Sequence, residues 1–297
     1  MGRSVKKNYG EMSQSGKCPA DLYGSPSRII AYLRYYFFFN YSTMRWILLN
    51  NFGKGMEMIP RKDFVTILDY GAGPGTASLA VCDFLEETKG LSGYENTKVK
   101  LYFDERIGDF AICYKKMLSK HGKAASVDYV YEKDENWKIN YYDMIMISYV
   151  LSELDGNMQQ WLITNVHNCL KDNGFLVIIE PAYKGMRKFI GTFLKDRLIR
   201  GSFEIIDASG PLCSEKSCDK WGECCGKSIK RKELRIPDGM KEKMKRPFEE
   251  KKRKRIKWGY AILKDFLYVE GKIYRCSYQN LPSVSVTEIV EHIKRVD

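Results

Sequence analysis

The residues best suited to chemistry in this chain are a glycine-rich run, Asp69-Tyr70-Gly71-Ala72-Gly73-Pro74-Gly75. The run follows a short β-branched and apolar stretch, residues 65–68, and precedes an apolar pattern typical of a helix, residues 76–88. Glycine lets a strand-to-helix turn adopt backbone angles that other residues avoid, and it lets a ligand lie against bare backbone. The run therefore predicts a nucleotide-type site at the carboxyl end of a strand.

The spacing of the glycines narrows the class of ligand that the loop could bind. No Gly-Lys-Ser/Thr follows, which excludes a P-loop, and only Pro74 separates Gly73 from Gly75, whereas the dinucleotide fingerprint places two residues there. The tighter spacing is typical of sites for S-adenosylmethionine, which has no pyrophosphate. We therefore predict contacts to this cofactor from Asp69, Gly71, Gly73 and Gly75. The alternatives are a tight turn without a ligand and a vestigial site.

Asp104 is the fifth predicted cofactor contact. It ends the next predicted strand, residues 99–103, and its carboxylate would accept hydrogen bonds from the two ribose hydroxyls. Asp104 lies farther from the loop than the usual spacing of about 20 residues. We explain the extra length by the polar segment 86–98, which we predict to be a loop.

Eight of the nine cysteines form two groups. Three of them lie in apolar periodic segments and are predicted to be small buried hydrophobes: Cys82, Cys113 and Cys169. The second group has five members, of which four lie close together in the sequence and one lies downstream. We predict that four of these five bind a metal: Cys213, Cys218, Cys224, Cys225 and Cys276. They lack the paired Cys-x2-Cys spacing of zinc sites, so their irregular spacing favours an iron–sulfur cluster, with zinc or free thiols as alternatives.

The charge of the chain is concentrated in one segment. The net charge is +12, and Lys227 to Lys257 alone contains 15 Lys and Arg against 5 Asp and Glu. The densest run is Lys251 to Arg255. Such a segment neutralises phosphates, so we predict an RNA partner; a solvated loop or a localisation-type basic run is the alternative. Pro237, Gly239 and Pro247 predict a loop or extended arm here.

Alternating strands and helices must position these residues, so we predict an α/β fold with a parallel sheet covered on both faces. The predicted helices are residues 27–52, 76–88, 107–121, 158–170 (ended by Asn173-Gly174) and 187–200, and the predicted strands are 65–68, 99–103, 126–131, 142–149 and 175–179. Short strands and a final helix are expected in residues 258–296. No apolar stretch is long and uncharged enough for a membrane helix, and the polar N-terminus is not a secretory signal.

The order of several motifs resembles the methyltransferase-like small-ribosomal-subunit assembly factors, known best from mitochondria, with bacterial and archaeal relatives. The similar segments span about residues 28–278 and are Asp69 to Ala77, Ser148 to Leu154, Ile178 to Pro181, Gly210 to Trp221 and Trp258 to Leu263. The chain departs from the family's cysteine pattern, because Pro and His do not follow Cys213 and Pro does not follow Cys218. Cys224 and Cys225 compete for the third position, and the fourth ligand is Cys276 or both members of the doublet.

The resemblance implies a Rossmann-like class I methyltransferase fold with a cysteine-rich metal-cluster loop and a small C-terminal β-rich extension. It also implies S-adenosylmethionine, a 4Fe–4S cluster, and small-subunit ribosomal RNA or a ribosomal particle as partner. We divide the chain into a polar arm, 1–25; the cofactor-binding domain with its N-terminal helix, 26–205; and the cysteine loop, basic arm and C-terminal extension, 206–297. The expected location is cytoplasmic, or the mitochondrial matrix in a eukaryote.

Three functions are compatible with these features. The first is methyl transfer to the small subunit or its RNA, the second is a non-catalytic RNA-binding assembly factor with a structural cluster, and the third is a small-molecule methyltransferase. No acceptor-activating motif follows the fourth predicted strand, so no catalytic residue is named. Glu153 could accept a proton or cap the following helix.

Overall fold

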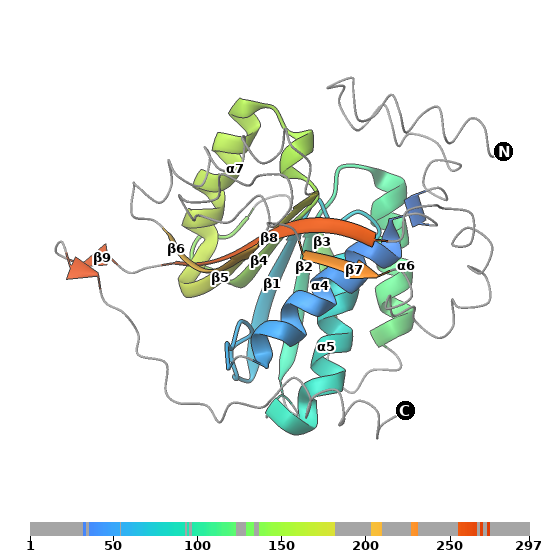
Figure 1. Ribbon diagram of the computed structural model, residues 1–297, viewed down its shortest axis with the longest axis horizontal. Helices are drawn as coiled ribbons and strands as arrows, with labels where there is room; N and C mark the ends of the chain where they lie inside the picture. The colour runs from blue at the N-terminus through green and yellow to red at the C-terminus, as the bar shows by residue number, and fades with distance from the viewer. Residues whose placement is uncertain are drawn as a thin grey trace.

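The computed structural model describes the following residues of the chain: 32–33, 36–53, 55–92, 94, 97–122, 129–133, 137–181, 203–209, 227–230, 255–265, 268–269 and 272–273. Within these ranges an eight-stranded sheet has the order β3-β2-β1-β4-β5-β8-β6, with β7 also paired to β8 (Figure 1). Its strands are β1 Phe64–Tyr70, β2 Lys98–Asp104, β3 Tyr129–Lys133, β4 Tyr142–Ser148, β5 Leu170–Pro181, β6 Phe203–Ser209, β7 Lys227–Lys230 and β8 Arg255–Asp265. A separate antiparallel pair comprises β9 Tyr268–Val269 and β10 Lys272–Ile273.

Strands β1 to β5 are parallel, and β8 is antiparallel to β5. Strand order 3-2-1-4-5 followed by an antiparallel strand before the sixth confirms the predicted methyltransferase-like Rossmann fold. The central strands β1 and β4 are buried along nearly their whole length. This burial matches their apolar runs, since a parallel sheet is covered on both faces.

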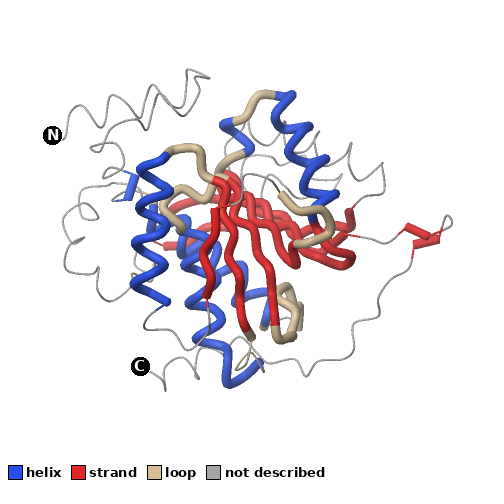
Figure 2. The backbone as a smooth tube through the Cα atoms, turned by 180° about the vertical axis from the view of Figure 1, so that it is seen from behind, coloured by secondary structure: helices blue, strands red, loops and turns tan. Residues whose placement is uncertain are grey.

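Helices cover the two faces unequally (Figures 1 and 2). The described helices are α4 Phe37–Phe52, α5 Thr76–Ser92, α6 Gly108–Gly122 and α7 Gly156–Cys169, with a 3-10 turn at Leu151–Glu153. Helices α4, α5 and α6 share one core cluster with the sheet, and α7 contributes to the cluster on the opposite face. Among the described residues, α7 is therefore the one helix on its face of the sheet.

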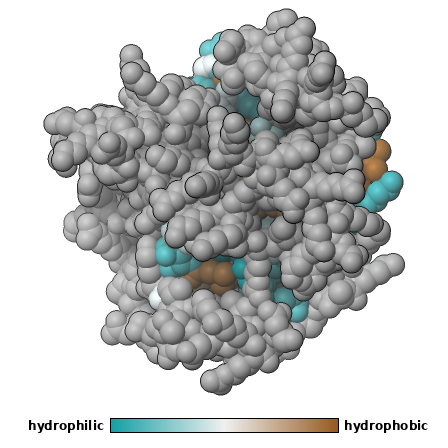
Figure 3. Space-filling view, turned by 45° about the vertical axis from the view of Figure 1, so that its right-hand side comes forward, coloured by the Kyte–Doolittle hydropathy of each residue, from teal (hydrophilic) through white to brown (hydrophobic). Residues whose placement is uncertain are grey.

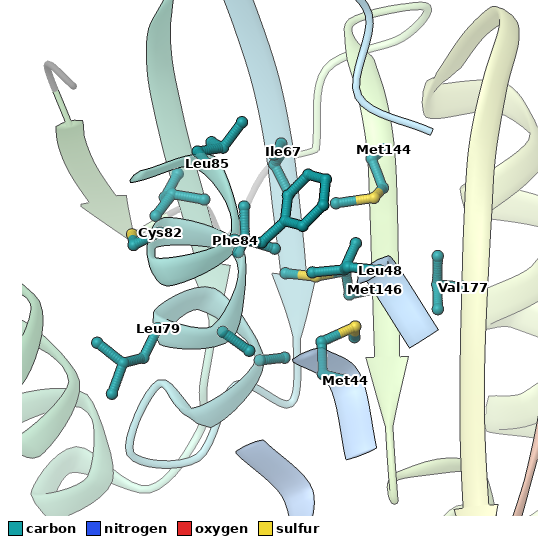
Figure 4. Close-up of a cluster of buried hydrophobic side chains, with 14 of the residues drawn as sticks. Met44, Leu48, Ile67, Leu79, Cys82, Phe84, Leu85, Met144, Met146 and Val177 are labelled. Atoms are coloured by element: carbon teal, nitrogen blue, oxygen red, sulfur yellow. The ribbon is translucent and has the colours of Figure 1, made fainter. Parts of the chain in front are cut away.

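The larger core joins α4 and α5 to the middle of the sheet (Figure 4). Met44 and Leu48 from α4 belong to the same buried cluster as Phe84 and Leu85 from α5 and Ile67 from β1. Ion-pair and hydroxyl contacts, Arg45 to Glu87 and Tyr41 to Asp83, add polar links between the same two helices. This packing holds the start of α5, and with it the glycine loop, against the sheet.

Cys82 and Cys169 are fully buried free cysteines, which confirms their prediction as small hydrophobes, while Cys113 is only half-buried. Burial raises the pKa of the Cys113 thiol.

Figure 3 shows one face of the molecule, where the described surface is largely hydrophilic around a small apolar area. No described helix is long and apolar enough to cross a membrane.

Two predicted helix boundaries were wrong. Helix α5 continues to Ser92, so the first part of the segment predicted as a loop, 86–98, is helical. Helix α7 ends at Cys169 instead of at Asn173-Gly174, because Leu170 already has extended backbone angles. Asn173 has a positive φ of 65° and lies in a β-bulge, where the register of β5 against β4 shifts. The Asn-Gly pair therefore bends a strand and does not end a helix.

The antiparallel part of the sheet unites segments that the sequence separates. Strand β8 pairs with β5 on one side and with β6 on the other. Strand β6 crosses the expected boundary between residues 205 and 206. The prediction of a loop or arm for Lys227 to Lys257 was wrong at both ends, because Lys227–Lys230 pairs with residues 255–258 of β8. The interior of that segment lies outside the described residues, as do 1–31 and the predicted helix 187–200.

Candidate functional site

The glycine loop closes by hydrogen bonds to its own neighbourhood. The N–H groups of Gly71 and Ala72 donate to the Asp104 carbonyl at 2.8 and 3.3 Å. The Gly73 N–H donates to the Glu105 carboxylate at 2.7 Å, and the Gly75 N–H donates to the Ala72 carbonyl at 2.9 Å. Pro74 has no N–H to offer. These four donors all point at protein acceptors, so the loop does not cradle a phosphate in the manner of a P-loop.

All three predicted glycines adopt backbone angles that favour glycine, with φ of 63°, 54° and 88° at Gly71, Gly73 and Gly75. A Cβ at Gly71 would lie 2.4 Å from a Val150 methyl, and one at Gly75 would lie 2.8 Å from the Tyr114 ring. A Cβ at Gly73 would meet only the Tyr32 hydroxyl, at 3.8 Å. The first and last glycines therefore serve packing, and Gly73 faces the more open side where a ligand can approach.

Asp69 is buried behind the loop and joins the end of β1 to the start of α5. Its Oδ2 accepts hydrogen bonds from the Ser78 N–H at 3.2 Å and from the Ser78 hydroxyl at 2.7 Å. The Tyr114 hydroxyl donates in turn to Ser78 at 2.9 Å. Burial raises the pKa of Asp69 to about 7, and the Ser78 hydrogen bonds oppose that rise. Asp69 thus occupies the position of an anchor for the loop.

Asp104 lies beside the loop at the end of β2, because β1 and β2 pair in register up to Tyr70 and Asp104. Its side chain is half-buried, and its Oδ2 accepts a hydrogen bond from the Trp137 indole at 3.1 Å. The Trp137 ring also meets the edge of Tyr70, with centroids 5.1 Å apart. Trp137 was missed by sequence reasoning, since it lies in the linker before β4 with no motif around it.

Glu105 is a second acidic residue at this edge that sequence reasoning missed. It is buried, and besides Gly73 it accepts the Ile107 N–H at 2.7 Å. Burial raises its pKa, and the two backbone hydrogen bonds oppose that rise. Its position directly after Asp104 was the available signal. Asp69, Asp104 and Glu105 together place three carboxyl groups around the glycine loop, which disfavours a pyrophosphate there.

The turn after β4 forms the opposite side of the site. Tyr149 has a positive φ of 63°, which is rare for an aromatic residue and marks a strained position. Its N–H donates to the Ile179 carbonyl at 2.7 Å, and the next residue but one, Leu151, donates its N–H to Glu180 at 2.7 Å. Val150 between them packs on Gly71.

Glu180 is fully buried at the end of β5, and this burial raises its pKa to about 8, opposed by hydrogen bonds from Ser152 and Leu151. Helix α7 begins at Gly156 with Asp155 as its N-cap, so the expectation of Glu153 as a cap was wrong. Glu153 itself is exposed, at the end of the 3-10 turn.

Tyr32, from the N-terminal helical segment, reaches over the glycine loop. Its hydroxyl accepts a hydrogen bond from Asn40 at 3.0 Å, and its ring meets Phe110 of α6 edge-on at 5.2 Å. Burial raises its pKa, and the charges of Glu153 and Glu105 raise it further.

Two buried hydroxyls at this edge have no hydrogen-bond partner within the described part of the chain: Thr76 Oγ1 after the loop and Ser148 Oγ at the end of β4. Unpaired buried hydroxyls are costly, and a bound ligand can satisfy them. The open side of Gly73, the Asp104 carboxylate and these hydroxyls fit a nucleoside with a cationic centre.

The cysteine and basic segments leave the sheet at this same edge. Ser209 pairs with Tyr260 and Lys227 pairs with Trp258, so β7 continues the line of β6 along β8. The two strand ends that flank residues 210–226 therefore pair with β8 two positions apart. Trp258 also pairs with Pro181 at the carboxyl end of β5, which is the edge that carries the glycine loop.

The predicted metal ligands lie outside the described residues: Cys213, Cys218, Cys224, Cys225 and Cys276. Within the described ranges no group of His, Cys, Asp and Glu has the arrangement of a metal site. The chemistry of the donors still fits a cluster, since four thiols lie in a segment whose two ends are pinned to one strand.

Comparison with protein families identifies the chain. Residues 26–259 match the model of the mitochondrial small ribosomal subunit Rsm22 family. The chain belongs to this family. The matched range runs through the glycine loop, the turn after β4 and the cysteine and basic segments, and it ends inside β8. Membership of the Rsm22 family confirms the resemblance drawn from the motif order.

Two solved structures illustrate what this Rsm22-family chain is similar to. The YcgJ protein from Bacillus subtilis shares 10% identity over 73% of this chain and 97% of its own, with a TM-score of 0.42. Phosphoethanolamine N-methyltransferase 2 from Haemonchus contortus, in complex with S-adenosylhomocysteine, shares 11% identity over 83% of this chain and 59% of its own, with a TM-score of 0.45. At these values neither likeness carries an argument about substrate. No curated protein matches the chain.

Proposed function

We propose that this protein binds S-adenosylmethionine and transfers its methyl group to the small ribosomal subunit or its RNA during assembly. The observation that carries the proposal is the hydrogen bonding of the loop. The N–H groups of Gly71, Ala72, Gly73 and Gly75 are all used by protein acceptors, and three carboxylates surround them. Such a site disfavours a phosphate and suits the sulfonium and ammonium charges of this cofactor.

Two roles follow for the cofactor contacts. Asp104 would hold the ribose diol, with Trp137 orienting its carboxylate through the indole N–H. Gly73 would let the cofactor approach the backbone, while Asp69 and Glu105 hold the loop in shape. Methyl transfer from a sulfonium depends mainly on in-line positioning, so the absence of an obvious base does not count against it.

The partner is proposed to be small-subunit RNA, gripped by Lys227 to Lys257. The family description names the mitochondrial small ribosomal subunit, which also favours the matrix over the cytoplasm as location. Support from this chain comes from the paired ends of the segment, since Lys230 pairs with Arg255 beyond the edge that carries the cofactor site. RNA held by this segment would lie beside the methyl donor.

A 4Fe–4S cluster on four of the five cysteines completes the proposal, and zinc is the alternative metal. The test is anaerobic purification followed by iron and sulfide assay of the full chain and of Cys213→Ser. Cys113→Ser is the matched control, because Cys113 lies on α6 far from that segment in sequence. Zinc without sulfide in the purified protein would refute the cluster.

The test of the main proposal uses labelled S-adenosylmethionine, immature small subunits and the purified full chain. We expect label in the RNA or in a subunit protein, and less of it with Asp104→Asn. If the cofactor binds and no label is transferred, the second candidate function stands instead: a non-catalytic assembly factor. The missing acceptor-activating motif after β4 favours that candidate. If label reaches only small molecules, the protein is a small-molecule methyltransferase.

A further inference from the structure

Exposed apolar side chains gather on the α7 side of the sheet. Four large apolar residues are exposed among those described: Phe64, Ile112, Ile139 and Trp161. Trp161 on α7 is 45% exposed and Ile139 is 80% exposed. Phe64 alternates along β1 with Leu68 and Tyr70, which pack in the α7 core, so it belongs to the same face. Only Ile112, on α6, lies on the other face.

Helix α7 itself contains no charged residue other than its histidine. Its 14 residues read GNMQQWLITNVHNC, in a chain of which 29% is Asp, Glu, Lys or Arg. The polar groups on its exposed positions are uncharged amides and a hydroxyl: Asn157, Gln160, Thr164 and Asn168. A helix face that meets only water usually carries charges. The composition of α7 therefore points to a face that hydrogen-bonds with a partner and does not repel anions.

The linker before β4 runs alongside α7 and extends this surface. The Asn140 N–H donates to the Asn168 carbonyl at 2.9 Å, and the rings of Trp137 and Trp161 lie 5.8 Å apart. Residues 137–141 and the outward face of α7 from Trp161 to Asn168 thus form one surface, which we name the α7 strip. At 1.5 Å per helical residue it is about 10 Å long.

Cations lie along and beyond the α7 strip. Lys138 is exposed, and its Nζ lies 4.6 Å from the centroid of the Tyr141 ring. At the far end Lys62 and Lys171 share the single carboxylate of Asp143, at 2.5 and 3.1 Å, so that group keeps a net positive charge. At the near end Trp137 donates to Asp104, which connects the strip to the cofactor edge.

We propose that the α7 strip is a second contact surface for RNA and that it binds an unpaired strand. A base stacks on Trp161, the lysines meet phosphates, and the amides of α7 hydrogen-bond with sugars and base edges. Lysines and amides separate the apolar side chains here, so the surface lacks the continuous apolar patch that marks many protein interfaces. The inference rests on the proposed function in taking RNA as the partner.

The experiment measures binding of a short fluorescein-labelled oligouridylate to the full chain, with a duplex of the same length as comparison. Because a stacked base contributes strongly to single-strand affinity, Trp161→Ala should raise the Kd for the single strand about tenfold or more and change the Kd for the duplex much less. Trp161→Phe should restore most of the affinity. Ile112→Ala is the matched control, since it removes an equally exposed apolar side chain from the opposite face.

The outcomes separate this inference from the proposed function. If neither RNA binds the wild-type chain, the RNA partner itself fails. If RNA binds, and neutralising Lys251 to Arg255 weakens it while Trp161→Ala does not, the α7 strip is overturned and the proposed function stands. If Trp161→Ala instead removes a protein from co-purified small subunits, the surface is a protein interface and the inference is wrong. Unchanged thermal melting and S-adenosylhomocysteine affinity show that each variant is folded.

Discussion

The parallel and antiparallel parts of the sheet position chemistry in different ways. In the parallel part, β1, β2 and β4 end in turns of a few residues whose backbone groups are hydrogen-bonded to one another, as at Gly71 and Asp104. In the antiparallel part, β6, β7 and β8 hold only the ends of the cysteine and basic segments. The first arrangement suits a small ligand that needs fixed contacts, and the second suits a large partner.

The comparison teaches that both arrangements meet at one edge of the sheet. The parallel strands bring their carboxyl ends there by connectivity. The antiparallel β8 brings its amino end to the same edge, as its pairing of Trp258 with Pro181 requires. If the two parts act separately, cofactor binding and RNA binding should respond to different substitutions, and the following predictions test that separation.

The largest expected effect is on the cofactor. Gly71→Ala places a Cβ 2.4 Å from Val150 at a φ of 63°. Backbone strain of about 1–2 kcal/mol, added to displacement of Val150, should weaken S-adenosylhomocysteine binding about a hundredfold in isothermal titration calorimetry. Gly108→Ala is the control, because a methyl group added there would meet nothing within 4 Å. Wild-type affinity for Gly71→Ala would show that the loop does not hold the ligand.

The second prediction concerns the basic segment. Replacing Lys251 to Arg255 by glutamine should lower the slope of log Kd against log salt by about 0.7 for each lost phosphate contact with a single strand. RNA affinity at low salt should fall about a hundredfold, and cofactor affinity should stay the same. Neutralising Lys115 and Lys116, exposed on α6, is the matched control. A parallel loss of cofactor affinity would contradict the separation of the two parts.

The third prediction concerns Asp104. Hydrogen bonds to a charged group contribute about 1.5–3 kcal/mol, so Asp104→Asn should weaken S-adenosylhomocysteine binding about tenfold or more. The 2′-deoxy analogue should bind the wild type less well, and Asp104→Asn should reduce that difference. Trp137→Phe, which removes the indole donor and keeps a smaller aromatic ring, should have a smaller effect. Asp109→Asn on α6 serves as control; an analogue preference that survives in Asp104→Asn would rule out the ribose contact.

The smallest expected effect is on the pH dependence of stability. Burial raises the pKa of Glu180 from its ordinary value of 4.5 to about 8. Between these two pH values the folded state keeps a proton that the unfolded chain has released. The unfolding free energy therefore falls as pH rises from about 4.5 to about 8. Asp69 contributes in the same direction up to about 7.

Glu180→Gln keeps an acceptor for the Leu151 N–H and removes this titration. The Tm of both proteins should fall from mildly acidic to mildly basic buffer. The fall should be smaller for Glu180→Gln than for the wild type, by about 5 °C or more. Asp172→Asn, an exposed carboxylate near the other end of β5, is the control. Equal slopes for Glu180→Gln and the wild type would show that the carboxyl does not titrate in this range.

Local patterns predicted the cofactor half well. The β-branched run before Asp69, the glycine spacing and the alternation of elements each depend on consecutive residues, and the structure has β1, the loop and α5 where they indicate. Asp104 lies beside the loop, as expected from its place after a buried strand, and its contact with a cofactor stays a prediction. Glu105, Trp137 and Tyr32 were missed, because their roles depend on contacts with residues at least 32 positions away.

By itself, the sequence determined the parallel fold, the glycine loop and the two segments rich in cysteine and in basic residues, because short-range backbone preferences and composition encode these features. Only the tertiary structure decided that β8 lies between β5 and β6, that the basic segment begins and ends in paired strands, and that the loop amides are occupied by Asp104 and Glu105. Strand register and burial are properties of distant segments packed together, and no local pattern specifies them.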